Sequence, residues 1–421
     1  MNCMPKLYEH QKKIIDQDPK KCGLFLGTGS GKTRTALLLA RGKTLVICPK
    51  TQKEDENWER EAQKIEFKNK ITVISKETFR RDQSKLQKFD TIIVDEAHTC
   101  LGVTPNVRWV KKQPIPKTSQ LYEALKFFIE RTKPERVYLC TATIIKSPMT
   151  VWGAGEILGT KCDFYKWRNT FYYRLNMPGR DVYMVKSDTD TKKLLATFVK
   201  KLGYVGQLSD YFDVPDQTYR VIHIGLTDKQ KRRLKELPME YPDPLVLVGK
   251  RHQVENGCLA GDEYNPSEEY ENEKLEKLVE LSFEFPRMVI FAKYRHQIAQ
   301  IHHRMVKEGK KVLVLTGDTK DRGKVIFEAN NSKECIFIAQ AQVSSGWELP
   351  DYPVMVFASM SYSVVDRIQG EGRILRANKL KKNLYIDLVV KDGVDNAVYK
   401  CISNKKDFNE KLYVKGKISK A

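Results

Sequence analysis

Short apolar runs rich in β-branched residues alternate with stretches of helical spacing along the whole chain of 421 residues. This alternation is typical of parallel sheets that are covered by helices. Segments with helical spacing include 34–40 and 119–129. The runs that we interpret as buried strands are 23–26, 44–48, 71–75, 91–95 and 137–141 in the first half, and 221–225, 288–292, 312–316, 335–339, 354–358 and 384–390 in the second.

The pattern occurs twice, and the length exceeds what one hydrophobic core usually supports, so we expect two domains. The segment 212–218 contains a proline, aspartates and polar turn residues, which is typical of a junction. The predicted domains are 1–214 and 215–421. The predicted fold class is α/β, with a mostly parallel sheet flanked by helices in each domain.

The charge of the chain is strongly basic. Lys and Arg total 74 against 53 Asp and Glu, which gives a net charge of +21. Such an excess attracts polyanions such as nucleic acids and makes their binding depend steeply on salt. Charge alone leaves open the alternative of a soluble protein with a lysine-rich surface.

The nine cysteines contain no CxxC pair, which is typical of reduced thiols that fill space in a core. His252 and Cys258 lack a second pair of ligands, so a structural zinc is not expected. No apolar run is long enough to cross a bilayer, and the N-terminus lacks the apolar core of a secretion signal. We therefore expect no membrane partner and a location in the cytoplasm, or in the host cytoplasm if the protein is viral.

A glycine-rich turn joins an apolar strand to a helix in GLFLGTGSGKT (23–33). Phosphates bind where backbone N–H groups, a helix N-terminus and a cation converge. Gly29 and Gly31 allow a tight turn, Lys32 is placed to reach the β- and γ-phosphates, and Thr33 is placed to ligate Mg²⁺. The stretch therefore predicts a nucleotide site.

The loop departs from the strict phosphate-binding pattern at one position. The pattern expects glycine where this chain has Leu26, so Gly27 together with Gly29 must supply the bend. The alternative is an ordinary strand-to-helix turn without a ligand.

The run TIIVDEAH (91–98) delivers an acidic pair to the end of a predicted buried strand. Ligands of parallel sheets gather at the carboxyl ends of the strands. Asp95 is suited to hold Mg²⁺, and Glu96 to orient or deprotonate an attacking water. An ordinary helix N-cap is the alternative, but a phosphate loop about sixty residues earlier makes it less favoured.

The stretch RIQGEGRILR (367–376) places Arg373 and Arg376 three positions apart, so they would share one face of a helix. Phosphoryl transfer accumulates negative charge that an arginine relieves. The two arginines would meet the γ-phosphate only if the two domains close on each other. Two solvated arginines on a surface helix are the alternative.

Together these residues resemble the motif set of superfamily-2 helicases and translocases, over nearly the whole chain. A single motif is weak, but their order and spacing are specific. The motifs are LYEHQ (7–11), GTGSGKT (27–33), LVICPKT (45–51), DEAH (95–98), TAT (141–143), VIFAKYR (289–295), AQVSSGWELP (341–350) and QGEGRILR (369–376).

The resemblance implies two RecA-like domains with an ATP cleft between them, and ATP and Mg²⁺ as cofactors. Expected nucleotide-binding residues are Gln11 (adenine), Gly29, Ser30, Gly31, Lys32, Thr33, and Gly346 and Glu348 near the ribose. Expected catalytic residues are Lys32, Asp95, Glu96, Gln369, Arg373 and Arg376, with Thr33 and Asp95 as metal ligands. His98, Thr141 and Thr143 are expected to couple the nucleotide state to the grip on a polymer.

Within the superfamily the chain resembles compact Swi/Snf-type translocases, especially the short versions carried by phages. Segments 44–65, 73–79 and 140–153 carry this likeness. It implies a monomeric, DNA-stimulated ATPase that moves along duplex or forked DNA with weak sequence preference, in replication, recombination or repair, including phage branch migration. An RNA helicase and a DNA-binding scaffold with a vestigial ATP site are the rival interpretations.

Phosphates of the DNA backbone would be met by hydroxyls, amides and lysines. The expected contacts are Lys50, Thr51, Thr78, Lys293, Thr316 and Gln340. The basic, proline-rich stretch 104–118 is expected to be an irregular loop. Arg108, Trp109, Lys111 and Lys112 in this loop are suited to a wedge or DNA clamp, with Trp109 stacked on a base; the favoured alternative is that Trp109 pins the loop to the core.

Overall fold

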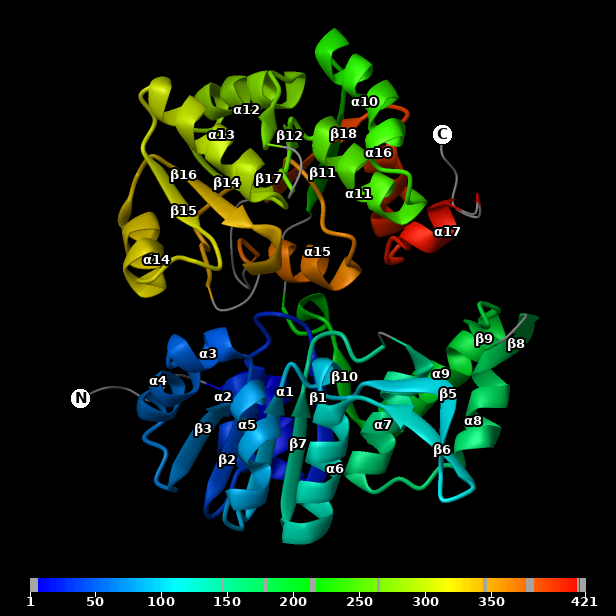
Figure 1. The fold of residues 1–421 in the computed structure, drawn as a ribbon. Coiled ribbons are helices and arrows are strands. Elements are labelled where there is room, and N and C mark those ends of the chain that lie inside the picture. Colours follow the sequence, from blue (N-terminus) through cyan, green and yellow to red (C-terminus); the bar gives the residue numbers. More distant parts are fainter. Residues whose placement is uncertain are drawn as a thin grey trace. The chain divides into compact units, whose positions relative to one another are not determined.

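The computed structural model describes residues 7–145, 147–177, 180–212, 217–262, 266–343, 347–375, 382–414 and 416. The chain divides into two compact units, Met1–Phe212 and Asp213–Ala421 (Figure 1).

Unit 1 is built on a six-stranded parallel sheet with the order β10-β1-β7-β4-β2-β3. Its strands are β1 (Lys21–Leu26), β2 (Thr44–Cys48), β3 (Ile71–Ser75), β4 (Thr91–Asp95), β7 (Arg136–Cys140) and β10 (Gly203–Gly206). Its α-helices are α1 (Glu9–Asp16), α2 (Lys32–Leu39), α3 (Lys50–Glu54), α4 (Asn57–Lys64), α5 (Lys76–Asp82), α6 (Gln120–Thr132), α7 (Pro148–Leu158), α8 (Phe164–Phe171) and α9 (Thr189–Leu202).

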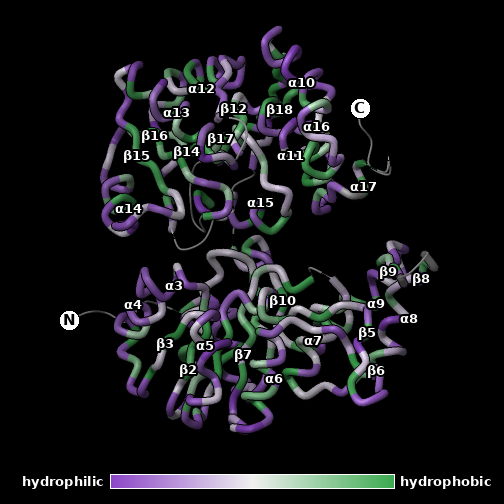
Figure 2. The backbone as a smooth tube through the Cα atoms, viewed as in Figure 1, coloured by the Kyte–Doolittle hydropathy of each residue, from purple (hydrophilic) through white to green (hydrophobic). Residues whose placement is uncertain are grey.

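Both faces of this sheet are buried, which is why its strands read as nearly continuous apolar runs. Successive residues of a strand point to opposite faces. On β4, Ile93 packs in the core that α1, α2 and α4 cover, whereas Ile92 and Val94 pack in the core that α5, α6 and α7 cover. Figure 2 shows the hydrophobic colours along strands such as β2 and β7 and hydrophilic colours on outer helices such as α4.

Unit 2 repeats the architecture with a second six-stranded parallel sheet, in the order β11-β18-β17-β14-β16-β15. Its strands are β11 (Thr218–Ile224), β14 (Arg287–Ala292), β15 (Val312–Leu315), β16 (Cys335–Gln340), β17 (Val354–Phe357) and β18 (Leu384–Val390). Its α-helices are α10 (Asp228–Glu240), α11 (Pro244–Glu255), α12 (Glu273–Glu284), α13 (Arg295–Lys307), α14 (Arg322–Asn331), α15 (Val364–Glu371), α16 (Val394–Ser403) and α17 (Glu410–Val414). Helices α12 and α13 cover one face through Leu278, Ile298 and Ile301.

The predicted fold class is confirmed: each unit is an α/β layer structure of the RecA-like kind. Every predicted strand occurs, with bounds that differ by at most a few residues. The sequence missed β10, a short edge strand with two glycines, because it offers too few apolar residues to form a recognisable run. The expected ATP cleft between the two domains stays a prediction.

The prediction that 104–118 is an irregular loop is wrong. The segment forms an antiparallel hairpin of β5 (Val103–Val110) and β6 (Gln113–Thr118). Three prolines hid these strands, because proline cannot donate to a sheet ladder and is confined to edges and isolated ribbons such as this one. Two further ribbons pair β8 (Tyr172–Met177) with β9 (Arg180–Val185), and β12 (Cys258–Leu259) with β13 (Glu268–Glu269).

Candidate functional site

The loop between β1 and α2 has the backbone shape that its glycines were expected to allow. Gly29 and Gly31 have φ of 80° and 79°, in the left-handed region that L side chains rarely adopt. Gly31 is the N-cap of α2, and a Cβ there would lie 2.4 Å from Nε2 of Gln11. At Leu26, where the strict pattern has glycine, the chain is still in β1, so the turn starts one residue later, at Gly27.

Within this loop the polar groups converge on the Gly27 carbonyl. Ser30 Oγ donates to it at 2.7 Å, and Lys32 Nζ donates to it at 3.0 Å and to the Leu26 carbonyl at 2.8 Å. Ser30 is completely buried, whereas Lys32 and Thr33, at the start of α2, are partly exposed. The N-terminus of α2 and the side chain of Lys32 therefore lie at the same loop, which is the arrangement that binds phosphate.

Gln11 on α1 forms hydrogen bonds to the loop and to the first turn of α2. Its Nε2 donates to the Gly31 carbonyl at 3.1 Å and to Thr35 Oγ1 at 3.3 Å, and its Oε1 accepts from the Tyr8 amide at 2.9 Å. The side chain is completely buried. Gln11 thus braces the phosphate loop, and its expected reading of adenine stays a prediction.

His10 is a second brace, one that the sequence did not single out. Its Nε2 lies 2.9 Å from the Ser30 carbonyl, and its ring stacks on Tyr211 at a centroid distance of 3.9 Å. Burial lowers the pKa of His10, which favours the neutral ring. The only hint in the sequence was that His10 is adjacent to Gln11 in the stretch LYEHQ (7–11).

Asp95 is the last residue of β4, and Glu96 follows it with φ of 43°, a left-handed conformation. The Asp95 carboxylate accepts from Trp58 Nε1 at 3.2 Å and from the Glu96 amide at 2.9 Å. Burial and the neighbouring Glu96 raise the pKa of Asp95. Two carboxyl groups at one buried strand end favour a cation beside them, which fits the expected magnesium ligand.

Strand β7 lies between β1 and β4, so three strand ends meet at one edge of the sheet. His98 Nδ1, in the 3₁₀ turn Ala97–Thr99, lies 2.8 Å from Thr141 Oγ1 and 3.4 Å from Thr143 Oγ1. The same nitrogen lies 3.4 Å from Glu96 Oε2. The structure therefore brings together all three residues predicted for coupling and the expected catalytic carboxylate.

Lys76, like His10, is a residue of this site that sequence reasoning missed. It begins α5, is 6% exposed, and its Nζ donates to the Glu96 carbonyl at 2.9 Å and to Thr99 Oγ1 at 2.6 Å. The only available signal was its place in the segment 73–79, between a strand and Thr78. Lys76 ties this segment directly to the backbone of Glu96.

In unit 2, Gln369 lies on α15 and is mostly buried, and Arg373 follows the helix. Arg373 is 7% exposed, and its Nη1 donates to the Trp347 carbonyl at 3.1 Å. Arg373 of the stretch 369–376 thus packs against Trp347 of the stretch 341–350. Glu348 is exposed, and its carbonyl accepts from Asn330 Nδ2 at 3.1 Å.

The prediction of one helical face for both arginines is wrong for Arg373. Helix α15 ends at Glu371 with Gly372 as its C-cap, and Arg373 lies in the turn that follows, where its amide bonds three residues back to the Gly370 carbonyl at 2.9 Å. Arg376 and Gly346 lie outside the described residues.

The residues expected to contact DNA occupy strand ends or helix starts in both units. Lys50 is exposed and 3.5 Å from Glu54, Thr51 lies next to it in α3, and Thr78 Oγ1 accepts from Ser75 Oγ at 3.1 Å. Thr316 and Gln340 follow or end the neighbouring strands β15 and β16, and Gln340 Oε1 accepts from the Gly317 amide at 3.3 Å. Their expected contacts with a polymer stay predictions.

Lys293, after β14, has a different environment. Its Nζ lies 3.0 Å from the centroid of the Tyr362 ring, and its amide donates to Ser359 Oγ at 2.8 Å. Burial lowers the pKa of Lys293 to about 7. A nearby anion would raise that pKa, so this lysine is suited to respond to phosphate.

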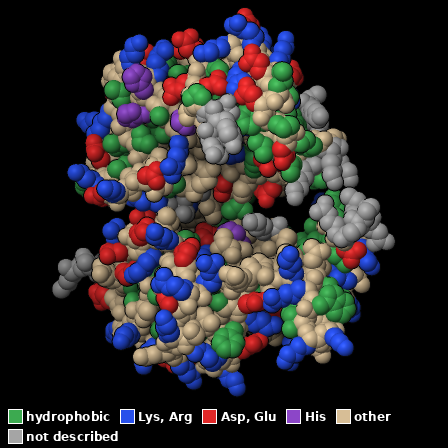
Figure 3. Space-filling view, viewed as in Figure 1, with side chains coloured by type: hydrophobic (Ala, Val, Ile, Leu, Met, Phe, Trp, Pro, Cys, Tyr) green, Lys and Arg blue, Asp and Glu red, His purple; other side chains and the backbone are tan. Residues whose placement is uncertain are grey.

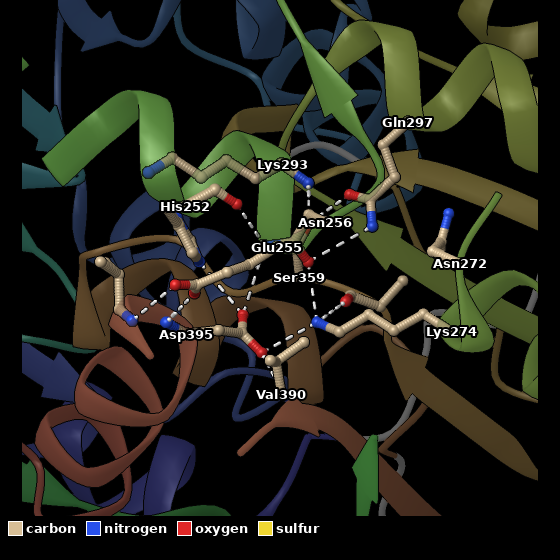
Figure 4. Close-up of polar contacts among 12 residues, drawn as sticks. His252, Glu255, Asn256, Asn272, Lys274, Lys293, Gln297, Ser359, Val390 and Asp395 are labelled. Carbon is tan, nitrogen blue, oxygen red and sulfur yellow. Dashed lines mark hydrogen bonds and ion pairs between the residues drawn. The ribbon is translucent and has the colours of Figure 1, made fainter. Parts of the chain in front are cut away.

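A buried polar cluster lies beside Lys293 and joins α11, α12 and α16 (Figure 4). Lys274 Nζ donates to Asp395 Oδ2 at 2.9 Å and to Asn256 Oδ1 at 2.7 Å, and His252 Nε2 lies 3.1 Å from Asp395 Oδ1. Burial opposes ionisation of Asp395, but Lys274 and His252 hold its pKa below the usual range. Glu255 accepts from the Asp395 amide at 2.7 Å.

His252 and Cys258 do not form half a metal site. The His252 ring bonds to Asp395 and to the Tyr294 hydroxyl, and burial raises the pKa of Cys258 to about 12. Within the described ranges, no group of three or more His, Cys, Asp or Glu is arranged to hold a metal ion. Among those same residues, no helix has both the length and the apolar character of a membrane span.

Comparison with known proteins adds two findings. Residues 272–378 match the family model described as the helicase conserved C-terminal domain. Among solved structures, the chain is similar to the Sulfolobus solfataricus SWI2/SNF2 ATPase core in complex with dsDNA, with 16% sequence identity and a TM-score of 0.39, over 99% of this chain and 94% of that chain. No curated protein sequence matches the chain.

Residues 272–378 of the second unit therefore resemble a helicase C-terminal domain, and the predicted resemblance to helicases is confirmed over these residues. The stretches 289–295, 341–350 and 369–376 all lie within the matched residues. Because the TM-score is low, the fold class rests on the sheet topology and not on that likeness. The DEAH-box and phage-like parts of the resemblance stay predictions.

Proposed function

We propose that the chain is an ATP-driven DNA translocase or helicase. The observation that carries the proposal is the convergence in unit 1 of a lysine-bearing phosphate loop, an acidic pair and the His98–Thr141–Thr143 group on three adjacent strand ends. A bare strand-to-helix turn would not need the other two groups beside it.

Each residue of the site has a proposed role in ATP hydrolysis. The N-terminus of α2 and Lys32 bind the phosphates, and Glu96 orients or deprotonates the attacking water. Thr33 and Asp95 offer the hydroxyl and carboxylate oxygens that Mg²⁺ prefers; when bound, Mg²⁺ neutralises charge on the phosphates. His98 Nδ1 lies 2.8 Å from Thr141 Oγ1 and 3.4 Å from Glu96 Oε2, so a shift of either residue changes the surroundings of the other.

The proposal assigns the arginines of unit 2 to the transition state. Arg373 and Arg376 would neutralise the charge that develops during phosphoryl transfer, and Gln369 would contact the γ-phosphate. The two units would close and reopen with each ATP. The contacts that one unit makes with the polymer would then shift relative to those of the other unit.

DNA is the proposed polymer because the Swi/Snf-like stretches accompany a net charge of +21. Figure 3 shows Lys and Arg side chains spread over both units on the face drawn. Such a charge supports binding to phosphates but does not choose between DNA and RNA. The finer assignments, to forked DNA, to branch migration and to a monomer, belong to the same proposal.

The test is a comparison of ATP turnover with closed circular duplex DNA, single-stranded DNA and RNA at one stated salt concentration. We expect stimulation by DNA, and we expect Lys32→Ala and Glu96→Gln to lower the stimulated rate by at least about 100-fold. Stimulation by RNA alone would favour the RNA helicase. Negligible turnover in the parent, unchanged in both variants, would favour the scaffold.

A further inference from the structure

The β5–β6 hairpin is part of unit 1 (Figure 1). It follows the DEAH stretch (95–98) in the chain and leads into α6. Its base is closed where the Ser119 amide donates to the Gly102 carbonyl at 2.7 Å. The pairs Trp109↔Pro114 and Val110↔Gln113 leave Lys111 and Lys112 as a two-residue turn.

Trp109, next to the tip, is 71% exposed. The other four tryptophans of the chain, Trp58, Trp152, Trp167 and Trp347, are at most 6% exposed. The expectation that Trp109 pins the segment to the core is therefore wrong. Residues two apart share a face of a strand, and Val107 on this face packs against the core, but Trp109 lies two pairs nearer the tip and beyond the core.

The turn itself is built from residues that suit its backbone poorly. Lys111 and Lys112 have φ of 47° and 65°, both in the left-handed region. Two-residue hairpin turns of this kind favour Asn-Gly because L side chains are strained there. The chain keeps two cations at positions where glycine or asparagine would be more stable.

The hairpin is basic throughout. Residues 103–118 include Arg108, Lys111, Lys112 and Lys117 and no acidic residue. Arg108 pairs with Glu123 of α6. In the part of the chain that the structure describes, no ion pair involves the three lysines, and all three are exposed.

Contacts along the hairpin hold its tip in place. The Tyr165 hydroxyl donates to the Pro114 carbonyl at 3.2 Å, opposite Trp109, and Arg168 donates to the Pro105 carbonyl at 3.4 Å. Thr118 Oγ1 donates to Glu123 at 2.6 Å. A ligand that meets this tip has little ordering entropy to overcome.

We propose that this hairpin tip is a binding site for single-stranded DNA, in which Trp109 stacks on an unpaired base and Lys111 and Lys112 bind the flanking phosphates. A single strand presents unstacked base faces between negatively charged phosphates. An exposed indole can stack on such a base while the cations on either side of it bind the phosphates. A closed duplex offers the phosphates but keeps its base faces stacked inside. The site is separate from the ATP site, so its test needs no ATP turnover.

Iodide distinguishes Trp109 from the other tryptophans, because it quenches an exposed indole and does not reach the buried ones. The full chain is titrated, without nucleotide, with a thymidine oligonucleotide of about 20 nucleotides, longer than the usual site of a single-strand-binding fold. We expect the oligonucleotide to quench tryptophan emission and to protect it from iodide. Closed circular duplex at equal phosphate concentration should leave the emission nearly unchanged.

Variants of Trp109 separate the contribution of ring stacking to affinity from the change in tryptophan emission. Trp109→Phe should lose the emission change but bind the labelled oligonucleotide, by anisotropy, within about threefold of the parent, whereas Trp109→Ala should bind about tenfold more weakly. Phe327→Ala is the matched control, since Phe327 is 72% exposed on α14 of the other unit. Circular dichroism checks that each variant is folded.

Three results would overturn the inference. The oligonucleotide binds without changing the emission, Trp109→Ala binds as tightly as the parent, or closed duplex quenches as strongly as the single strand. Since no outcome depends on hydrolysis, a chain without ATPase activity would refute the proposed function and leave this site intact.

Discussion

One buried lysine, Lys76, bonds the backbone of Glu96. A glutamate with φ of 43° is strained, and bonds from Lys76 and from Thr99 to its carbonyl hold it in this conformation. Lys76 Nζ holds the Glu96 carbonyl at 2.9 Å from a different strand end. Lys76 is also two residues from Thr78, an expected DNA contact, so it is placed to transmit a change in that segment to the proposed catalytic carboxylate.

We therefore predict that Lys76→Met lowers kcat for ATP by about 10- to 100-fold, because a small misplacement of a catalytic group costs that much. The affinity for ATP should change by less than about threefold, since Lys76 bonds no residue of the phosphate loop in the described structure. Steady-state kinetics and direct nucleotide binding measure the two separately.

Lys85→Met is the control for this prediction, because Lys85 is in the same unit with a side chain that is 80% exposed. It should leave both constants unchanged. An equal loss of kcat in the two variants, or a loss of affinity without a loss of kcat in Lys76→Met, would contradict the positioning role.

At the scale of elements, the buried cluster of Figure 4 fastens α12 and α16 to the sheet of unit 2. Lys274 is 1% exposed, and it bonds Asp395 as well as the Ala358 carbonyl after β17. A buried ion pair contributes little net stability when intact, but removal of one partner leaves the other charge buried and uncompensated.

Lys274→Met is accordingly expected to lower the free energy of unfolding by roughly 3–5 kcal/mol. Urea unfolding followed by circular dichroism measures the transition that the substitution shifts. Lys277→Met on the same helix removes a partly exposed lysine from a surface ion pair and should change the free energy of unfolding by less than about 0.5 kcal/mol. Equal stability of the two variants would show that Asp395 finds other compensation.

At the scale of the whole molecule, the groups of the proposed reaction are divided between two units of the same architecture. Unit 1 holds the phosphate loop and the acidic pair, and unit 2 holds Gln369 and Arg373. The proposed transition state therefore requires both units, although each has its own sheet and its own cores.

Arg373→Ala is predicted to lower ATP turnover by at least about 100-fold, because an arginine that neutralises the transferring phosphoryl group is worth 10³–10⁵ in rate. ATP binding should stay within about threefold of the parent, which also shows that unit 1 is folded. Arg304→Ala, which removes a surface ion pair of α13, is the matched control.

Normal hydrolysis by a folded Arg373→Ala chain would refute this role. Since Arg373 is buried, Arg373→Lys tests the charge with less change in packing. A lysine variant as slow as the alanine variant indicates that the planar guanidinium is needed and not only its charge.

The sequence by itself determined the features that depend on a few neighbouring residues. The apolar runs located the strands of both sheets because strands buried on two faces have no polar side. The glycines and Lys32 located the tight turn between β1 and α2, since φ near 80° and a helix N-terminus are local properties. Asp95 was found because it ends such a run.

Only the tertiary structure decided which strand ends meet and which side chains are covered. Thr141 lies beside His98 because β7 inserts between β1 and β4, an order that no local pattern specifies. Lys76 reaches Glu96 across twenty residues, and Trp109 is exposed because its strand extends past the core. The burial of a side chain and its hydrogen-bond partners are set by the packing of segments that are distant in the sequence. They can therefore be determined only from the folded structure.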